Sequence, residues 1–127
     1  MPELDAVHSR LREILRRHAG SMTVSRDGPG GMVVEMPGYE GKPWGYVAGT
    51  RMGKRYVSYY LMSVYAVSEL MAGISPGLRK RMQGKSCFNF ATIDEPLLAE
   101  LEALTVTAVA RHPDVLAAAL AADPKGR

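Results

Sequence analysis

The sequence has little cysteine, no long apolar run and no internal repeat. Its single cysteine, Cys87, excludes an internal disulfide framework and suits a reducing compartment. No apolar stretch approaches the roughly 18 residues that a membrane span needs. The first residues, Met-Pro-Glu-Leu-Asp, are acidic where a secretory leader is basic. We therefore expect a cytoplasmic protein without a membrane partner.

Strong charge of one sign is also absent. The formal net charge is only +3, and the basic residues form short groups on the first predicted helix and near positions 51–55 and 79–85. Such groups can contact phosphates, but no helix-turn-helix pattern, zinc-finger spacing or RNA-binding aromatic motif accompanies them. Short charge runs on amphipathic helices usually mark a solvated face. The sequence therefore disfavours nucleic acid as a partner.

A catalytic pattern is missing as well. The sequence shows no acid pair, no nucleophile–base pattern and no metal-ligand spacing among its histidines, His8, His18 and His112. The run Gly84-Lys85-Ser86 resembles the end of a phosphate-binding loop. That motif requires glycine where Arg79 stands, and it follows a strand and opens a helix, whereas here the order is reversed. We predict no cofactor or metal site, and we favour a binding protein over an enzyme.

The sequence does contain enough apolar material for a folded domain. Its 127 residues are 46% hydrophobic and 23% charged, which is ordinary for a soluble globular protein. A chain of this length buries a core without help from disulfides or metals. We interpret residues 1–127 as a single domain.

The predicted core strand covers residues 55–65. It is dense in tyrosine and β-branched residues, which suit a pleated, half-buried surface. On a period of two, Tyr60 falls on one face and Tyr59 on the other, and neither face is polar. A strand that is apolar on both faces belongs in the middle of a sheet.

The remaining elements follow from periodicity and turn residues. We predict an amphipathic helix from residue 2 or 3 to residue 18 or 19, because apolar residues recur every three or four positions. Turns that contain Gly or Pro separate the predicted strands, which cover 22–26, 32–36, 44–52, 55–65 and 86–90. Short helices are predicted at 68–71 and 76–82, with Ser75 as the N-cap of the second. A long helix covers 94–111, His112-Pro113 interrupts it, and a helical tail covers 114–122.

This order of elements predicts an α+β fold. We expect a two-layer sandwich with a mainly antiparallel sheet of about five strands and the N- and C-terminal helices on one of its faces. The other face stays less covered. An uncovered face that carries aromatic residues is where a ligand would bind.

Several runs of this sequence resemble one protein family. They are Met36-Pro37, Lys54 to Tyr65, Gly73-Ile-Ser-Pro76, Arg81-Met-Gln-Gly-Lys-Ser-Cys-Phe-Asn-Phe90 and Ile93-Asp94. Over residues 32–105 the chain looks like the YdhG-like family, small cytoplasmic bacterial proteins that form a domain of unknown function. The resemblance implies a fold similar to frataxin and to secretion-chaperone-like sandwiches. It also implies an alternative function, because one branch of the family is described as a frataxin-like iron-binding protein that serves iron–sulfur cluster assembly.

The iron alternative can be examined residue by residue. A frataxin-type iron surface is an exposed row of carboxylates on the first helix and first strand, because iron at such sites prefers hard oxygen ligands. This sequence has four acids in that region, Glu3, Asp5, Glu13 and Asp27. They are interleaved with arginines that would repel a cation, Arg10, Arg12, Arg16 and Arg17. The residues therefore favour a small-ligand- or protein-binding module, with iron binding as the alternative.

The candidate ligand-binding residues come from the predicted strands and from the turn before the last of them. They are Trp44, Tyr46, Tyr59, Lys85, Cys87 and Asn89. A pocket needs apolar walls and a few convergent polar groups, and here aromatic rings, a cation, a thiol and an amide fall on strands that can neighbour one another. The alternative is structural, with the rings in the core, the lysine solvated and the amide holding a loop. Cys87 likewise is either a buried apolar residue or a thiol activated by Lys85.

We also expect self-association. Eight methionines and six tyrosines leave more apolar surface than two helices can cover. An open sheet face or edge tends to find a partner, and a two-fold homodimer is the simplest solution.

Overall fold

The amphipathic N-terminal residues form α1 (Pro2–His18) in the computed structural model, which describes residues 2–122. Its apolar stripe is buried, with no side chain more than 5% exposed among Leu4, Val7, Leu11, Ile14 and Leu15. Acidic residues lie in the first turn and basic residues in the last, as the helix dipole favours. Gly20 follows the helix with a φ of 58°, a left-handed conformation that glycine adopts without strain.

Four consecutive strands then form an antiparallel meander, as predicted. They are β1 (Thr23–Gly28), β2 (Gly31–Glu35), β3 (Tyr46–Met52) and β4 (Val57–Leu61), and a single-turn 3-10 helix, η1 (Pro43–Gly45), precedes β3. The full sheet has six strands in the order β1-β2-β3-β4-β6-β5, and every neighbouring pair is antiparallel. β4 thus lies inside the sheet, in agreement with its two apolar faces.

β4 is shorter than predicted. The chain leaves the sheet after Leu61 and forms α2 (Met62–Ala66), although its residues continue the composition of the strand. Ser63 and Val64 are buried in α2, and the Ser63 hydroxyl lies 3.1 Å from Nδ1 of His112 in the C-terminal helix. Contacts with a distant part of the chain therefore decide the conformation of residues 62–66, where local composition favours a strand.

The segment after α2 contains two further short helices and the last two strands. These elements are α3 (Ser68–Ala72), α4 (Pro76–Arg79), β5 (Met82–Gln83) and β6 (Cys87–Phe90). Ser75 is the N-cap of α4, as predicted, and its Oγ accepts a hydrogen bond from the Leu78 amide. α4 ends earlier than predicted, because residues 82–83 pair with β6 and add a strand that periodicity did not indicate.

The last helix, α5 (Glu95–Ala122), is continuous, so the predicted interruption at His112-Pro113 is wrong. Pro113 cannot donate an intrahelical hydrogen bond because it lacks an amide hydrogen. The buried imidazole of His112 contacts Ser63 and the carbonyl oxygen of Trp44, and these contacts tie this turn of the helix to α2 and η1. Within residues 2–122, no helix combines the length and the apolar character that crossing a membrane requires.

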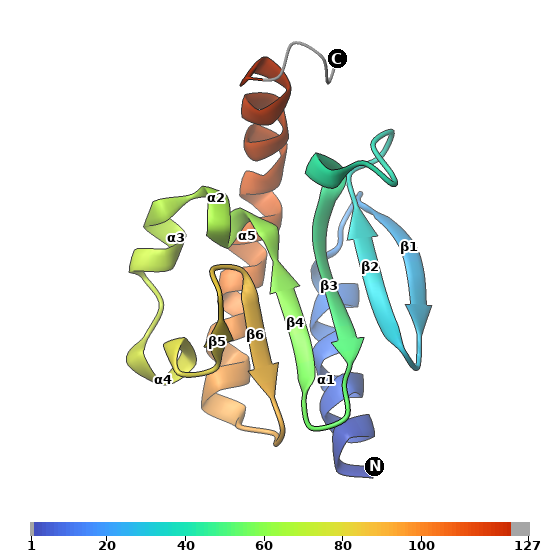
Figure 1. Ribbon diagram of the computed structural model, residues 1–127, viewed down its shortest axis with the longest axis vertical. Coiled ribbons are helices and arrows are strands. Elements are labelled where there is room, and N and C mark those ends of the chain that lie inside the picture. The colour runs from blue at the N-terminus through green and yellow to red at the C-terminus, as the bar shows by residue number, and fades with distance from the viewer. Residues whose placement is uncertain (1, 123–127) are drawn as a thin grey trace.

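The helices from the two ends of the chain, α1 and α5, cover the same face of the sheet (Figure 1). Thr50 of β3 and Tyr59 of β4 are register partners, so their side chains share a face. Nε2 of His8 in α1 lies 2.7 Å from the Thr50 hydroxyl, and the hydroxyl of Thr105 in α5 lies 2.7 Å from that of Tyr59. The core fills the space between, and its largest fully buried side chains include Tyr59, Phe88, Phe90, Leu11 and Leu101. The predicted α+β two-layer fold is confirmed.

Candidate functional site on the open face of the sheet

The face of the sheet opposite α1 and α5 is not covered by a helix within the described residues, and we call it the open face. Its central residues are Gly49 and Arg51 of β3, Ser58 and Tyr60 of β4, and Cys87 and Asn89 of β6. These six pair with one another across the three strands, and successive side chains of a strand point to opposite faces. They therefore lie on the side away from Tyr59 and the core.

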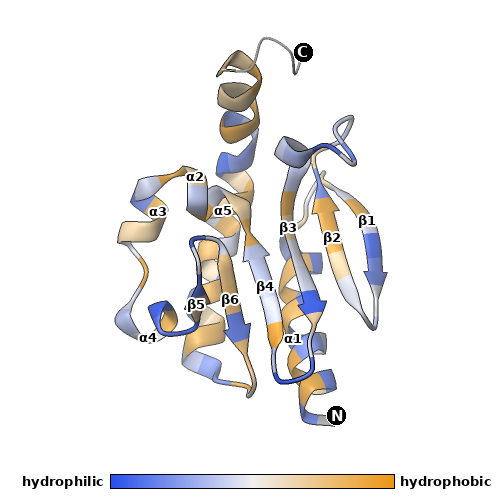
Figure 2. Ribbon diagram, in the orientation of Figure 1, coloured by the Kyte–Doolittle hydropathy of each residue, from blue (hydrophilic) through white to orange (hydrophobic). Residues whose placement is uncertain are grey.

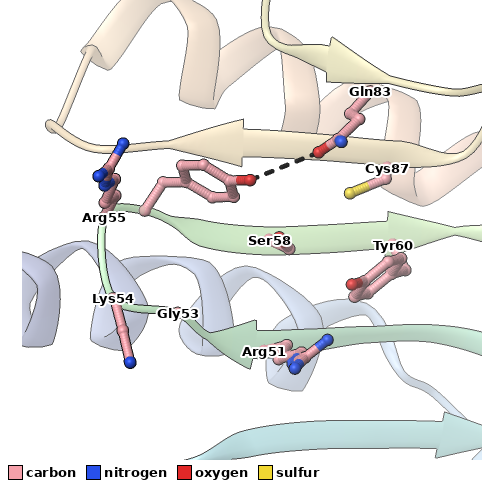
Figure 3. A pocket seen from close by; sticks show the side chains of 9 residues that line it. Arg51, Gly53, Lys54, Arg55, Ser58, Tyr60, Gln83 and Cys87 are labelled. Atoms are coloured by element: carbon pink, nitrogen blue, oxygen red, sulfur yellow. Dashed lines mark hydrogen bonds between the residues drawn. The ribbon is translucent and has the colours of Figure 1, made fainter.

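The turn between β3 and β4 closes one end of the open face and is strongly hydrophilic (Figure 2). A shallow hollow of about 360 Å³ lies next to this turn. Its lining includes Arg51, Lys54, Arg55, Tyr56, Ser58 and Tyr60. Figure 3 shows Arg51 and Tyr60 next to each other on neighbouring strands. The hollow therefore brings aromatic rings and cations together.

A second hollow of about 340 Å³ adjoins the first, and Arg51 and Tyr60 line both. Its other walls include Arg26 of β1 and Tyr46 of β3. The hydroxyl end of Tyr46 lies so close over Gly49 that a Cβ atom at position 49 would overlap it. Glycine at this position therefore lets the tyrosine ring approach the strand.

The cations of the open face have no acidic partner. Within residues 2–122, no hydrogen bond, ion pair or ring contact engages the charged groups of Arg26, Arg51, Lys54 and Arg55. Because a like-charged cluster without counter-ions attracts anions, this surface favours a negatively charged ligand.

The arginines of α1 are paired, in contrast. Arg10 binds the carboxylate of Glu95 with two hydrogen bonds of 2.6 and 2.7 Å. Arg16 binds Asp27 in the same way, at 2.7 and 3.0 Å. These bonds hold the pKa of both carboxyl groups below the usual range. The charge of these arginines is therefore compensated, whereas that of the open face is not.

Two tyrosine hydroxyls on the open face also lack a protein partner. No hydrogen bond within the described chain involves Oη of Tyr46 or Oη of Tyr60. Burial raises the pKa of Tyr46 well above its usual value, and the neighbouring Tyr60 adds to this shift. The Tyr46 hydroxyl therefore stays protonated near neutral pH and can donate a hydrogen bond. Together with Arg51, the two tyrosines present donors without acceptors.

Three of the six predicted ligand-binding residues come together on this face. They are Tyr46, Cys87 and Asn89. Both ends of the Asn89 amide are engaged, because Oδ1 accepts from the Ser58 hydroxyl at 2.7 Å and Nδ2 donates to Oε1 of Gln83 at 3.0 Å. The amide thus ties β6 to both neighbouring strands, which is a structural role. Cys87 is half-buried beside the first hollow, with Sγ 3.4 Å from Oδ1 of Asn89.

The other three predicted residues lie elsewhere. Tyr59 is completely buried on the face that α5 covers. Trp44 lies in η1, where its carbonyl oxygen is 3.4 Å from Nε2 of His112. Lys85 lies in the turn between β5 and β6, and its amine is 5.6 Å from the centre of the Tyr65 ring. None of these three side chains lines either hollow.

Arg51, Ser58 and Tyr60 are not among the predicted site residues. The period-two pattern does place Ser58 and Tyr60 on one face, opposite Tyr59. It does not indicate which of the two faces the helices cover, and no local signal aligns Arg51 with Ser58. A strand register is needed for that.

The open face carries no histidine to act as a base for Cys87. His8 and His112 are buried on the helix side, and Nε2 of His18 lies 2.6 Å from the Glu102 carboxylate on that side. Within residues 2–122, no group of three His, Cys, Asp or Glu side chains could hold a metal ion. The described surface therefore offers groups that bind, without a base that would activate a nucleophile.

Comparison with known proteins adds no assignment. No family model matches the sequence, and no curated protein or solved structure is significantly similar to it. The class of this protein therefore rests on its own features, an α+β two-layer fold and a basic, tyrosine-lined sheet face.

Proposed function

We propose that this protein is a small-ligand-binding module of the YdhG-like family, that its ligand site is the open face, and that it is not an enzyme. The observation that carries this proposal is the pair of adjoining hollows, where Arg51, Tyr46 and Tyr60 have no protein partner within residues 2–122. Convergent polar groups in a concave, partly aromatic surface are typical of ligand sites.

The runs of sequence that resemble the family lie at the same surface. The most specific run, residues 84–90, includes β6 and the turn that precedes it, and residues 54–65 include β4. Gln83 and Cys87 belong to the wall of the first hollow. The residues that resemble the family therefore build much of the proposed site.

Mapping by amide NMR tests the location of the site. In a screen of small soluble fragments, we expect chemical-shift changes centred on Gly49, Tyr60 and Cys87. Tyr60→Phe should weaken the binding of these fragments, because it removes a hydroxyl that faces both hollows. Tyr65→Phe is the matched control, because it removes a hydroxyl from an exposed ring that lines neither hollow. Fragments that perturb only the groove between α3 and α5 would contradict the proposal.

We further propose that the protein forms a homodimer. β1 is an edge strand with mostly exposed residues, and Val24 within it is 44% exposed. The other edge strand, β5, has only two residues. An unpaired edge as long as β1 can pair with the same edge of a second copy across a two-fold axis. Light scattering should give twice the 13.8 kDa of one chain, and Val24→Lys should give the monomer; a wild-type monomer at high concentration would contradict this.

Iron binding stays an alternative prediction. The acids that would be needed near α1 are partly engaged, since Asp27 is bonded to Arg16 and Glu13 to Arg17. Anaerobic calorimetric titration with ferrous iron tests the alternative, and stoichiometric micromolar binding would favour it over the open-face ligand. We also propose that the protein is cytoplasmic, and cell fractionation tests this location.

A further inference from the structure

The charge on the open face selects an anionic ligand. Four cations border the hollows without an acidic partner within residues 2–122, namely Arg26, Arg51, Lys54 and Arg55. Glu35 of β2 is an acid close to this surface, but it is buried and its carboxylate is occupied. It accepts hydrogen bonds from the hydroxyl of Ser25 and from the amide of Gly41. An anion therefore meets uncompensated positive charge here.

The arrangement of donors favours phosphate among anionic groups. The Arg51 guanidinium belongs to both hollows, and Tyr46 and Tyr60 stand beside it in the second. A guanidinium can hold two oxygens of one phosphate, and each tyrosine hydroxyl can donate to a further oxygen lone pair. A phosphate ester presents three terminal oxygens. Three unpartnered donors in one small area therefore match it better than they match a carboxylate.

A site for a planar ring lies beside these donors. Tyr56 and Tyr60 both line the first hollow and are four residues apart, which corresponds to about 13 Å along an extended chain. Ser58 stands between them, and its short, buried side chain lines the floor of the hollow (Figure 3). A flat ring fills such a space well, because it can stack on tyrosine. The ring site and the donors meet at Tyr60.

From these features we propose that the open face binds a nucleotide-like small molecule, in which a phosphate is joined to a planar ring. The phosphate is held by Arg51, Tyr46 and Tyr60, and the ring packs over Ser58. This inference rests on the proposed function and specifies its ligand. The hollows of about 360 and 340 Å³ lie at the small end of the range for ligand sites, roughly 300–1,000 Å³, which suits a mononucleotide.

Calorimetric titration of the full chain tests the ligand class. The probes are the four common ribonucleoside monophosphates, the matching nucleosides and inorganic phosphate. We expect at least one monophosphate to bind about tenfold or more tightly than its nucleoside and than phosphate alone, because each half of the ligand uses a different part of the site. Arg51→Gln should reduce the affinity for that monophosphate by about tenfold or more. Arg111→Gln is the matched control, because it removes the same charge from α5, and it should leave the affinity unchanged.

Four results would overturn the inference, and the first two separate it from the proposed function. If no monophosphate binds while fragments still map to the open face, the ligand class is wrong and the binding module stands. If neither binds, both proposals fall. If an oligouridylate binds more tightly than uridine monophosphate, with an affinity that falls steeply with salt, the ligand is single-stranded nucleic acid. An equal loss of affinity in the two arginine variants would also overturn the inference, because only net charge would then matter.

Discussion

Replacing Gly49 by alanine tests the close packing on which the open face depends. The added Cβ would overlap the hydroxyl of Tyr46 and would lie 2.5 Å from the carbonyl oxygen of Met32 in β2, closer than the 3.0 Å that real Cβ atoms keep. The tyrosine side chain can rotate away, but the carbonyl oxygen belongs to the backbone of the neighbouring strand. Strands β2 and β3 would have to shift, and overpacking of this kind costs about 1–3 kcal/mol. We expect a loss of this size in the free energy of unfolding.

Urea unfolding measures the loss, and Gly28→Ala is the matched control. A Cβ at Gly28 would meet no atom within 4 Å, and Gly28 is not among the glycines with positive φ. The control should therefore be neutral or stabilising by up to about 1 kcal/mol. In a Tyr46→Leu background, the cost of Gly49→Ala should fall but not vanish, because the backbone contact remains. Equal stability of the two alanine variants would refute the close packing of the Tyr46 ring over Gly49.

Three further predictions concern buried groups and a helix cap. Thr105→Val leaves the buried Tyr59 hydroxyl without its acceptor, so we expect it to lower the free energy of unfolding by about 1–3 kcal/mol. After Tyr59→Phe the threonine still donates to a backbone carbonyl of α5, so we expect a loss of only about 1 kcal/mol. Equal losses for the two variants would contradict this reasoning. Burial lowers the pKa of His8 and His112 in the folded state, so the unfolded chain binds more protons and stability should fall as the pH drops below about 6.5. His112→Gln should flatten the pH dependence of the melting temperature in this window, and an unchanged slope would argue against its burial. Ser75→Ala removes the N-cap of α4 and should cost about 0.5–2 kcal/mol in urea unfolding, while no loss would mean that the cap is not formed.

Most of the fold could be predicted from local patterns. The apolar stripe of α1, the meander of β1 to β4 and the N-cap at Ser75 all follow from periodicity and turn residues. The position of β4 inside the sheet follows from its two apolar faces. These features depend on residues that are close in the sequence, so the sequence displays them directly.

The errors occur where distant residues override local preference. Residues 62–66 have strand composition but form α2, because Ser63 packs against His112 of α5. α5 continues as one helix through Pro113, where the sequence indicates an interruption. β5 is too short to show a period at all, and only its pairing with β6 makes it a strand.

The candidate site shows the same division. Alternation by itself determined that Tyr59 and Tyr60 face opposite sides of one strand. Only the tertiary structure decided that helices cover the side of Tyr59 and leave Tyr60 open, because that choice depends on the packing of α1 and α5. The register between β3 and β4 then places Arg51 beside Ser58, and β1 brings Arg26 to the same hollow as Tyr60. A strand pattern has a period of two residues and carries no information about its neighbours, so the fold alone assembles this basic, tyrosine-lined surface.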